Sequence, residues 1–141
     1  MIIINMSILE KYIKKLRDSG LRPTKQRIKI CEVLFETEKT FHFSVNDLTK
    51  KIQNQSIEKI SVATVYNTVH AFEKKGYLKQ ISINSNQTYF DTNITDHHHF
   101  YDTKNDELID LDNSDIGPIN IQKSIPGKKI KSVEVLVKLE D

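Results

Sequence analysis

The sequence predicts an α+β protein whose first half is helical and whose second half is built from short strands. Apolar residues recur at helical spacing until about residue 75, and later segments alternate apolar and polar residues. Charge divides in the same way: residues 1–80 carry 15 Lys and Arg against 8 Asp and Glu, whereas residues 81–141 carry 6 against 11. A basic half suits contact with phosphates, and an acidic half with clustered His suits a cation.

Three helices are expected within the first 55 residues. The first ends near Gly20, a residue type that commonly closes helices. Pro23 prevents its continuation, and Thr24 can cap a second helix. Ser44 can cap a third helix, with Asp47 in the capping-box position. A polar stretch over residues 53–59 is expected to break this third helix. The inward apolar positions are Ile8, Leu9, Tyr12, Ile13 and Leu16 in the first helix, Ile28, Ile30, Val33 and Leu34 in the second, and Val45, Leu48 and Ile52 in the third.

A fourth helix, within residues 61–78, has an unusual polar face. The face opposite its apolar stripe is small, uncharged and able to form hydrogen bonds, and charged residues appear only in the last turns. Such a face suits insertion into the major groove of DNA, where Asn and Thr can read base edges. A Thr-rich surface helix is the alternative. The stripe consists of Val62, Val65, Val69 and Phe72, and the opposite face of Ala63, Thr64, Asn67, His70 and Ala71.

Two strands, Leu78–Ile83 and Gln87–Asp91, are expected after this helix, joined by turn-forming residues 84–86. Helices followed by a small hairpin predict a winged helix-turn-helix. Lys and Arg in the first turn of the second helix are unfavourable beside backbone N–H groups unless a phosphate is bound there, although simple solvated charges remain possible. The expected DNA contacts are Ser61, Thr64, Tyr66 and Asn67 on the fourth helix, with Lys25, Arg27 and Lys79 on phosphates.

The second half is expected to hold three strands: His97–Tyr101, Glu107–Leu111 and Ile130–Leu139. The last strand has one wholly apolar face, and about fifty residues with few aromatics bury too little surface to fold alone. A second copy of the chain is the economical partner, and a two-fold dimer would bind an inverted repeat in double-stranded DNA.

Three consecutive His, from His97 to His99, begin the first of these strands. In a strand, His97 and His99 point to one face and His98 to the other, so the outer two can chelate one metal ion. Asp91, Asp96 and Asp110 offer carboxylates nearby in the sequence. A solvated strand end is the alternative, and haem ligation by His97, His98 or His99 is a further possibility.

The segments LRPTKQR, FHFSVNDL, SVATVYNTV and TYFDTNITDHHHF, in this order and spacing, resemble the ferric uptake regulator family of bacterial metal-responsive transcription factors. The resemblance spans roughly residues 8–139. Within the family the chain is most similar to the Irr branch of iron and haem response regulators, which Tyr-Asn after ATV and the triple His indicate. The family resemblance implies a winged-helix DNA-binding domain over residues 1–90, a hinge at about 90–95, and a small α/β dimerisation and sensing domain over residues 96–141.

The resemblance also implies a regulatory site for one divalent ion, Fe, Mn or Zn, that joins the two domains through His42, Asp91, His99 and Asp110. Asp replaces the family's common Glu at two of these positions, which shortens the reach of the carboxylate. The single cysteine, Cys31, excludes a CxxC zinc site, and Glu32 after it excludes the Cys-Pro haem motif of some Irr proteins. No counterpart of the family's second metal site follows Asp110.

The sequence therefore predicts a cytoplasmic, homodimeric regulator of iron homeostasis genes that binds DNA in response to metal or haem and is not an enzyme. No apolar run is long enough for a membrane span. A relative tuned to zinc, manganese or peroxide is the first alternative, and a haem or metal buffer is the second. A metal-dependent hydrolase would need a general base or nucleophile motif, and none is evident.

Overall fold

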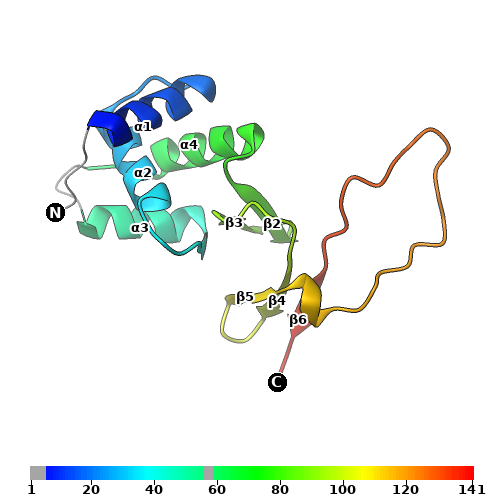
Figure 1. The fold of residues 1–141 in the computed structure, drawn as a ribbon. Coiled ribbons are helices and arrows are strands. Elements are labelled where there is room, and N and C mark those ends of the chain that lie inside the picture. The colour runs from blue at the N-terminus through cyan, green and yellow to red at the C-terminus, as the bar shows by residue number, and fades with distance from the viewer. Residues whose placement is uncertain (1–5, 56–58) are drawn as a thin grey trace. The chain divides into compact units, whose positions relative to one another are not determined.

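The computed structural model describes residues 6–55 and 59–141, and the chain divides into two compact units after Ile94. Within the described residues the first unit contains four α-helices and a three-stranded sheet, and the second contains a separate three-stranded sheet (Figure 1). The predicted α+β fold class is confirmed. None of the described helices is both long enough and apolar enough to cross a membrane.

The helices of the first unit are α1 (Met6–Asp18), α2 (Lys25–Phe35), α3 (Val45–Gln55) and α4 (Val62–Lys75). The two predicted N-terminal caps are present. Thr24 Oγ1 accepts a hydrogen bond from the Arg27 N–H at 3.2 Å, and Ser44 Oγ accepts one from the Asp47 N–H at 3.1 Å. Gly76 closes α4 in the left-handed region, at φ 85°, where glycine is favoured because it has no Cβ.

The expected break over residues 53–59 begins later than predicted, because α3 continues to Gln55. Residues 56–58 of that break lie outside the described residues.

The core of the first unit forms where α4 packs against α2 and α3. Val65, Val69 and Phe72 of the predicted stripe are fully buried, but Val62 is 48% exposed. The prediction for Val62 was wrong because this residue lies in the first turn of α4, at the end of the packed interface. The other fully buried members of the core are Leu16, Ile30, Cys31, Leu34, Leu48, Ile52 and Phe90.

The predicted hairpin is formed by β2 (Lys79–Asn84) and β3 (Gln87–Asp91), which pair antiparallel. A short strand that the sequence did not predict, β1 (His42–Phe43), pairs with the other edge of β3, so the strand order is β1-β3-β2. β1 therefore connects the segment between α2 and α3 to the wing, and its register places His42 opposite Asp91.

The second unit contains β4 (His98–Asp102), β5 (Glu107–Leu111) and β6 (Leu136–Leu139) in the order β5-β4-β6. β5 has the predicted bounds, and β4 begins one residue later than predicted. β4 and β5 pair antiparallel, whereas β4 and β6 pair parallel. A single 3-10 turn, Asn113–Asp115, follows β5.

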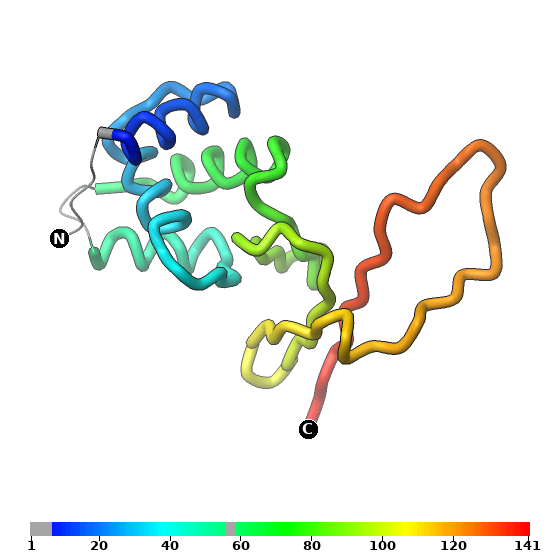
Figure 2. The backbone as a smooth tube through the Cα atoms, viewed as in Figure 1, coloured from blue at the N-terminus to red at the C-terminus, as the bar shows by residue number. Residues whose placement is uncertain are grey.

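The chain from Ile116 to Val135 has no helix or strand and runs as an open loop, drawn from orange to red (Figure 2). The predicted strand Ile130–Leu139 is therefore wrong over residues 130–135. β6 starts at Leu136 because its parallel partner there is His99, near the beginning of the five-residue β4, and no described strand extends further. The loop leaves large apolar side chains exposed: Ile119, Ile121, Ile125 and Ile130.

Candidate functional site

The exposed face of α4 is the first candidate site. Ser61 caps the helix, and its hydroxyl forms hydrogen bonds with the N–H and the hydroxyl of Thr64, at 3.1 and 2.9 Å. Tyr66 is 52% exposed and Asn67 is also exposed. Thr64 is half-buried and its hydroxyl already contacts Ser61, so Tyr66 and Asn67 are the predicted base-reading residues whose side chains are exposed.

The start of α2 lies beside the start of α4. Gln26 Nε2 donates a hydrogen bond to the carbonyl of Lys59, two residues before the Ser61 cap, at 3.2 Å. Two helix N-termini and the exposed Lys25 therefore share one region of the first unit, an arrangement that favours a phosphate. The sequence does not predict the pairing of Gln26 with Lys59, because only a long-range hydrogen bond brings these residues together.

The remaining two predicted cations differ in their surroundings. Arg27 is half-buried: its Nη1 donates to the Arg22 carbonyl at 2.8 Å, and its Nε is buried without a hydrogen-bond partner among the described residues. Lys79 is the cross-strand partner of Asp91 in the β2–β3 pairing. Its side chain therefore leaves the sheet on the same face as the Asp91 carboxylate.

His42 and Asp91 form the metal-ligand candidates of the first unit. His42 Nε2 lies 3.6 Å from Asp91 Oδ2. The Asp91 side chain is 1% exposed, and its other oxygen, Oδ1, accepts a hydrogen bond from the Asn93 N–H at 2.8 Å. That hydrogen bond orients the carboxylate and directs Oδ2 toward the imidazole.

His97, His99 and Asp110 converge in the second unit. Asp110 Oδ1 lies 3.3 Å from His97 Nε2 and 3.4 Å from His99 Nε2, and the three ligand atoms lie within 4.8 Å of one another. Asp110 is the direct cross-strand partner of His99. The alternation of His97 and His99 in a strand predicted that both could bind one metal ion, whereas the family resemblance implied only His99 for the regulatory site.

The tautomer of His97 favours ligation. Its Nδ1 lies 2.7 Å from the Thr95 carbonyl oxygen, which can only accept, so Nδ1 carries a proton. In the neutral ring the lone pair is then on Nε2, the atom that faces the Asp110 carboxylate. A lone pair and a carboxylate oxygen repel each other, and a cation bound by both atoms removes this repulsion.

His98 does not join this group. Its Nδ1 accepts a hydrogen bond from the Val135 N–H at 3.0 Å, so its ring supports the contact between β4 and the chain entering β6. The neutral ring carries its proton on Nε2 and cannot bind a metal through either nitrogen without losing this arrangement. His98 also lines a shallow cavity of about 360 Å³, together with Asn113, Ile116, Gly117, Pro118, Ile119 and Val133.

Two imidazoles and a carboxylate fit a divalent transition metal. Metal–ligand bonds of about 2.0–2.2 Å in tetrahedral geometry place neighbouring ligand atoms roughly 3.3–3.6 Å apart. The two His–Asp separations of the second unit, 3.3 and 3.4 Å, agree with this spacing. Mixed nitrogen and oxygen ligands suit Fe(II), Mn(II) and Zn(II) rather than Ca²⁺ or Mg²⁺.

Cys31 is not a ligand candidate. It is fully buried in the core, and burial raises the pKa of its thiol to about 12. The thiolate that metal binding requires is therefore disfavoured.

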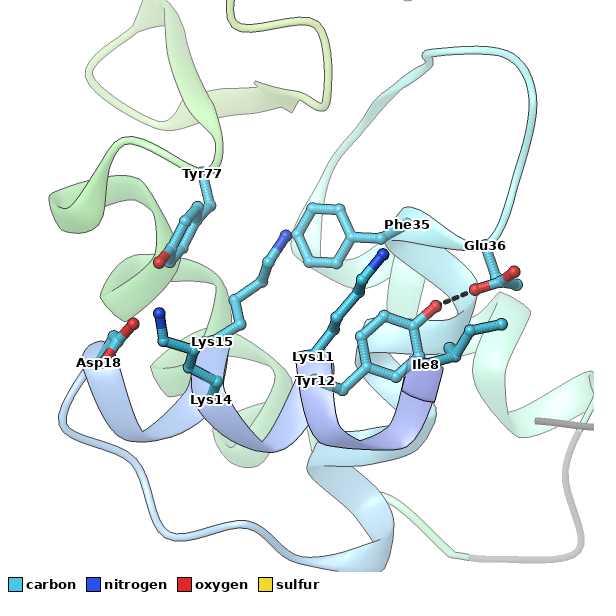
Figure 3. Close-up of a pocket in the computed structure, with 9 residues that line it drawn as sticks. All are labelled: Ile8, Lys11, Tyr12, Lys14, Lys15, Asp18, Phe35, Glu36 and Tyr77. Carbon is cyan, nitrogen blue, oxygen red and sulfur yellow. Dashed lines mark hydrogen bonds between the residues drawn. The ribbon is translucent and has the colours of Figure 1, made fainter. Parts of the chain in front are cut away.

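A separate cavity of about 590 Å³ lies along α1 (Figure 3). The Lys15 ammonium is 3.7 Å from the centre of the Phe35 ring and 4.7 Å from that of Tyr77, and burial lowers its pKa. Tyr12 donates a hydrogen bond to Glu36 at the other end, and burial with this bond raises the Tyr12 pKa. These contacts connect α1, the end of α2 and the residue after the α4 cap, which is a structural role.

Known proteins are similar over most of the chain. The family model described as "Ferric uptake regulator family" matches residues 18–139. A ferric uptake regulation protein from Neisseria meningitidis is 33% identical over 111 residues, which cover 77% of this chain and 76% of that protein. A peroxide operon regulator from Bacillus subtilis is 31% identical over 91 residues, which cover 64% of this chain and 61% of that protein.

The fold is similar to that of a solved ferric uptake regulator. The ferric uptake regulator of Vibrio cholerae superposes with a TM-score of 0.67 at 21% sequence identity, covering 92% of this chain and 98% of that one. The family match covers nearly the whole described chain, including α2 to α4, the wing and both His–Asp pairs. The chain belongs to the ferric uptake regulator family of metal-responsive transcriptional regulators.

Proposed function

We propose that this protein binds an operator in double-stranded DNA with α4 in the major groove and regulates genes of metal homeostasis in the cytoplasm. The observation that carries the proposal is the exposed pair Tyr66 and Asn67 on a capped helix whose start lies beside the cationic start of α2. Asn can form two hydrogen bonds with an adenine edge, while Lys25 and Arg27 contact phosphates and position the helix.

We propose that the two His–Asp pairs bind the regulatory metal. His42 with Asp91, and His99 with Asp110, are each aligned by the register of an antiparallel sheet, and His97 adds a ligand to the second pair. As the family resemblance implies, one ion shared by both pairs would couple metal binding to DNA binding. A typical coupling of about 1–3 kcal/mol changes operator affinity roughly 5- to 150-fold.

Iron is the metal we propose for this site, with zinc, manganese or a peroxide response as the alternative. The ligand set alone does not separate these metals, since all three accept imidazole and carboxylate and zinc binds more tightly than manganese or iron to most such sites. The metal retained by the protein after purification from a defined medium separates the alternatives.

Haem is a second proposed effector, supported by the triple His and by the similarity to the Irr branch. In that branch the iron-poor form binds DNA and haem opposes it. His97 and His99 are the proposed haem ligands, because His98 keeps its hydrogen bond with Val135. Replacing His97 and His99 with Ala should abolish a haem Soret shift, whereas His98→Ala should retain it; the reverse result excludes this assignment.

We propose that the protein acts as a homodimer through its second unit. Ile109, Ile121, Ile125 and Ile130 are between 40% and 64% exposed there, and a second copy is the partner that would bury them. Two identical α4 helices would then bind an inverted repeat.

The deciding experiment is selection of bound sequences from random duplex DNA, with and without Fe(II), Mn(II), Zn(II) or haem. We expect an inverted repeat whose enrichment depends on one of these ligands. Equal enrichment under all conditions would exclude the regulatory role, and the absence of any enriched sequence would exclude specific DNA binding. A metal buffer would give the second result while still binding metal.

A further inference from the structure

His70 lies between the exposed and the buried aromatic side chains of the first unit. It follows Tyr66 by one turn of α4, and the centres of the two rings are 4.1 Å apart with an interplanar angle of 43°. On its other side His70 meets the edge of the Phe90 ring, with centres 5.4 Å apart and planes at 82°. The imidazole therefore bridges α4 and β3.

Phe90 provides a fixed support for this contact. Its side chain is 1% exposed and stacks on Phe43, with ring centres 5.8 Å apart and planes at 26°. Phe43 and Phe90 are also cross-strand partners in the β1–β3 pairing. A ring that packs against Phe90 is consequently held against the sheet rather than against another mobile side chain.

Tyr66, by contrast, is held weakly. It is 52% exposed, and among the described residues no hydrogen bond fixes its hydroxyl group. An exposed Tyr without such a contact samples several rotamers, and that freedom must be lost when the ring contacts DNA. The stacking with His70 restricts the ring before DNA binds, as i, i+4 pairs do on a helix.

We propose that His70 is a positioning residue that holds the Tyr66 ring in its DNA-reading conformation by packing between Tyr66 and Phe90. This inference rests on the proposed function, because Tyr66 has a reading conformation only if α4 binds DNA. His70 itself is half-buried and need not touch a base. The position of a histidine on a polar helix face, four residues after a base-reading candidate, is thereby explained.

The test uses the full chain with His70→Ala, His70→Phe, Tyr66→Ala and the double variant Tyr66→Ala with His70→Ala. Affinities are measured by fluorescence anisotropy for the selected operator and for a scrambled duplex. His70→Ala should weaken operator binding about 3- to 10-fold, the cost of immobilising one more side chain. Binding to the scrambled duplex should not change, and His70→Phe should recover most of the loss because it retains a ring.

The double variant tests whether His70 acts on operator binding through Tyr66. In the Tyr66→Ala background, His70→Ala should have no further effect on operator affinity, since the ring that it positions is absent. An undiminished effect in that background, or an equal loss on both duplexes, overturns the proposal.

A measurement without DNA separates this inference from the proposed function. NMR couplings and ring contacts of Tyr66 should report one dominant rotamer in the wild type and averaging in His70→Ala. Averaging already in the wild type contradicts the positioning role, whatever the DNA results are. Failure of the wild type to select any operator, with a single Tyr66 rotamer still dependent on His70, refutes DNA recognition and not the contact.

Discussion

Asp91 at the end of β3 is the direct cross-strand partner of His42 at the start of β1, and its Oδ2 lies 3.6 Å from His42 Nε2. The same relationship recurs in the second unit between His99 and Asp110. A slip of one residue in either pairing would move the carboxylate to the opposite face of its sheet. Each His–Asp pair is thus held in place by sheet hydrogen bonds before a metal binds, which limits the reorganisation that binding requires.

Asp110→Asn should greatly weaken metal binding, because Asp110 Oδ1 lies 3.3 Å from His97 Nε2 and 3.4 Å from His99 Nε2. Loss of a ligand should exceed the roughly 10- to 100-fold cost of losing a supporting partner. Titration calorimetry with Mn(II) measures the change. Glu107→Gln, an exposed carboxylate on the same strand, is the matched control. Equal affinity in Asp110→Asn and the control would remove Asp110 from the site.

Asn67→Ala should cost about 1–3 kcal/mol of operator binding and relax the preference at one base pair, since a paired base edge would lose its hydrogen bonds. Lys25→Ala should instead weaken binding to all duplexes alike and reduce the salt dependence, because a phosphate contact carries no sequence information. Competition binding with single-base variants of the operator distinguishes the two. A uniform loss in both variants would contradict the division between base and phosphate contacts.

Ile121→Asp should convert the proposed dimer to a monomer, because a charge placed in its proposed apolar interface would not be compensated. Ile121 is 48% exposed in the single chain. Gln122→Asp adds the same charge at the next exposed position and should leave the dimer intact. Sedimentation equilibrium at micromolar concentrations is the measurement. A wild-type protein that sediments as a monomer, or two variants that behave alike, would exclude this loop from the interface.

Gly76→Ala should lower the free energy of unfolding by about 1 kcal/mol, because a Cβ is strained in the left-handed region. No atom lies within 4 Å of the position that this Cβ would take, so the cost arises from the backbone, with φ at 85°, and not from a clash. Gly117→Ala has equally open space and no positive φ, so it should be nearly neutral. Urea unfolding of both variants gives the comparison, and similar values for the two would show that the α4 cap is not strained.

Cys31 should make stability fall in alkaline solution. Burial raises its pKa from the ordinary 9.0 to about 12, so folding favours the neutral thiol. The unfolded chain loses its thiol proton first, and the stabilisation is therefore complete below pH 9.0 and is lost as the pH rises toward 12. Unfolding free energies of the wild type and Cys31→Ala measured across this range should converge at high pH. Parallel curves would contradict the burial effect.

Local sequence alone determined the helices and several of their ends. Thr24, Ser44 and Ser61 cap their helices through hydrogen bonds that span three residues, and Gly76 closes α4 through its own backbone freedom. The β2–β3 hairpin and β5 were also predictable, since turn formers and alternation act within a few residues. The family resemblance added the ligand candidates His42 and Asp91, which no local pattern connects.

The tertiary structure decided everything that depends on a partner distant in the chain. β1 exists because β3, more than forty residues later, offers it an edge, and β6 is short because β4 provides partners only from His99 onward. The Val135 N–H donates a hydrogen bond to His98 Nδ1, so His98 does not join the group formed by its two neighbours. His97 lies beside Asp110 because of the β4–β5 register. Periodicity predicts which residues share a face. It does not predict which strand or aromatic ring that face will contact, because long-range packing and hydrogen bonding determine this.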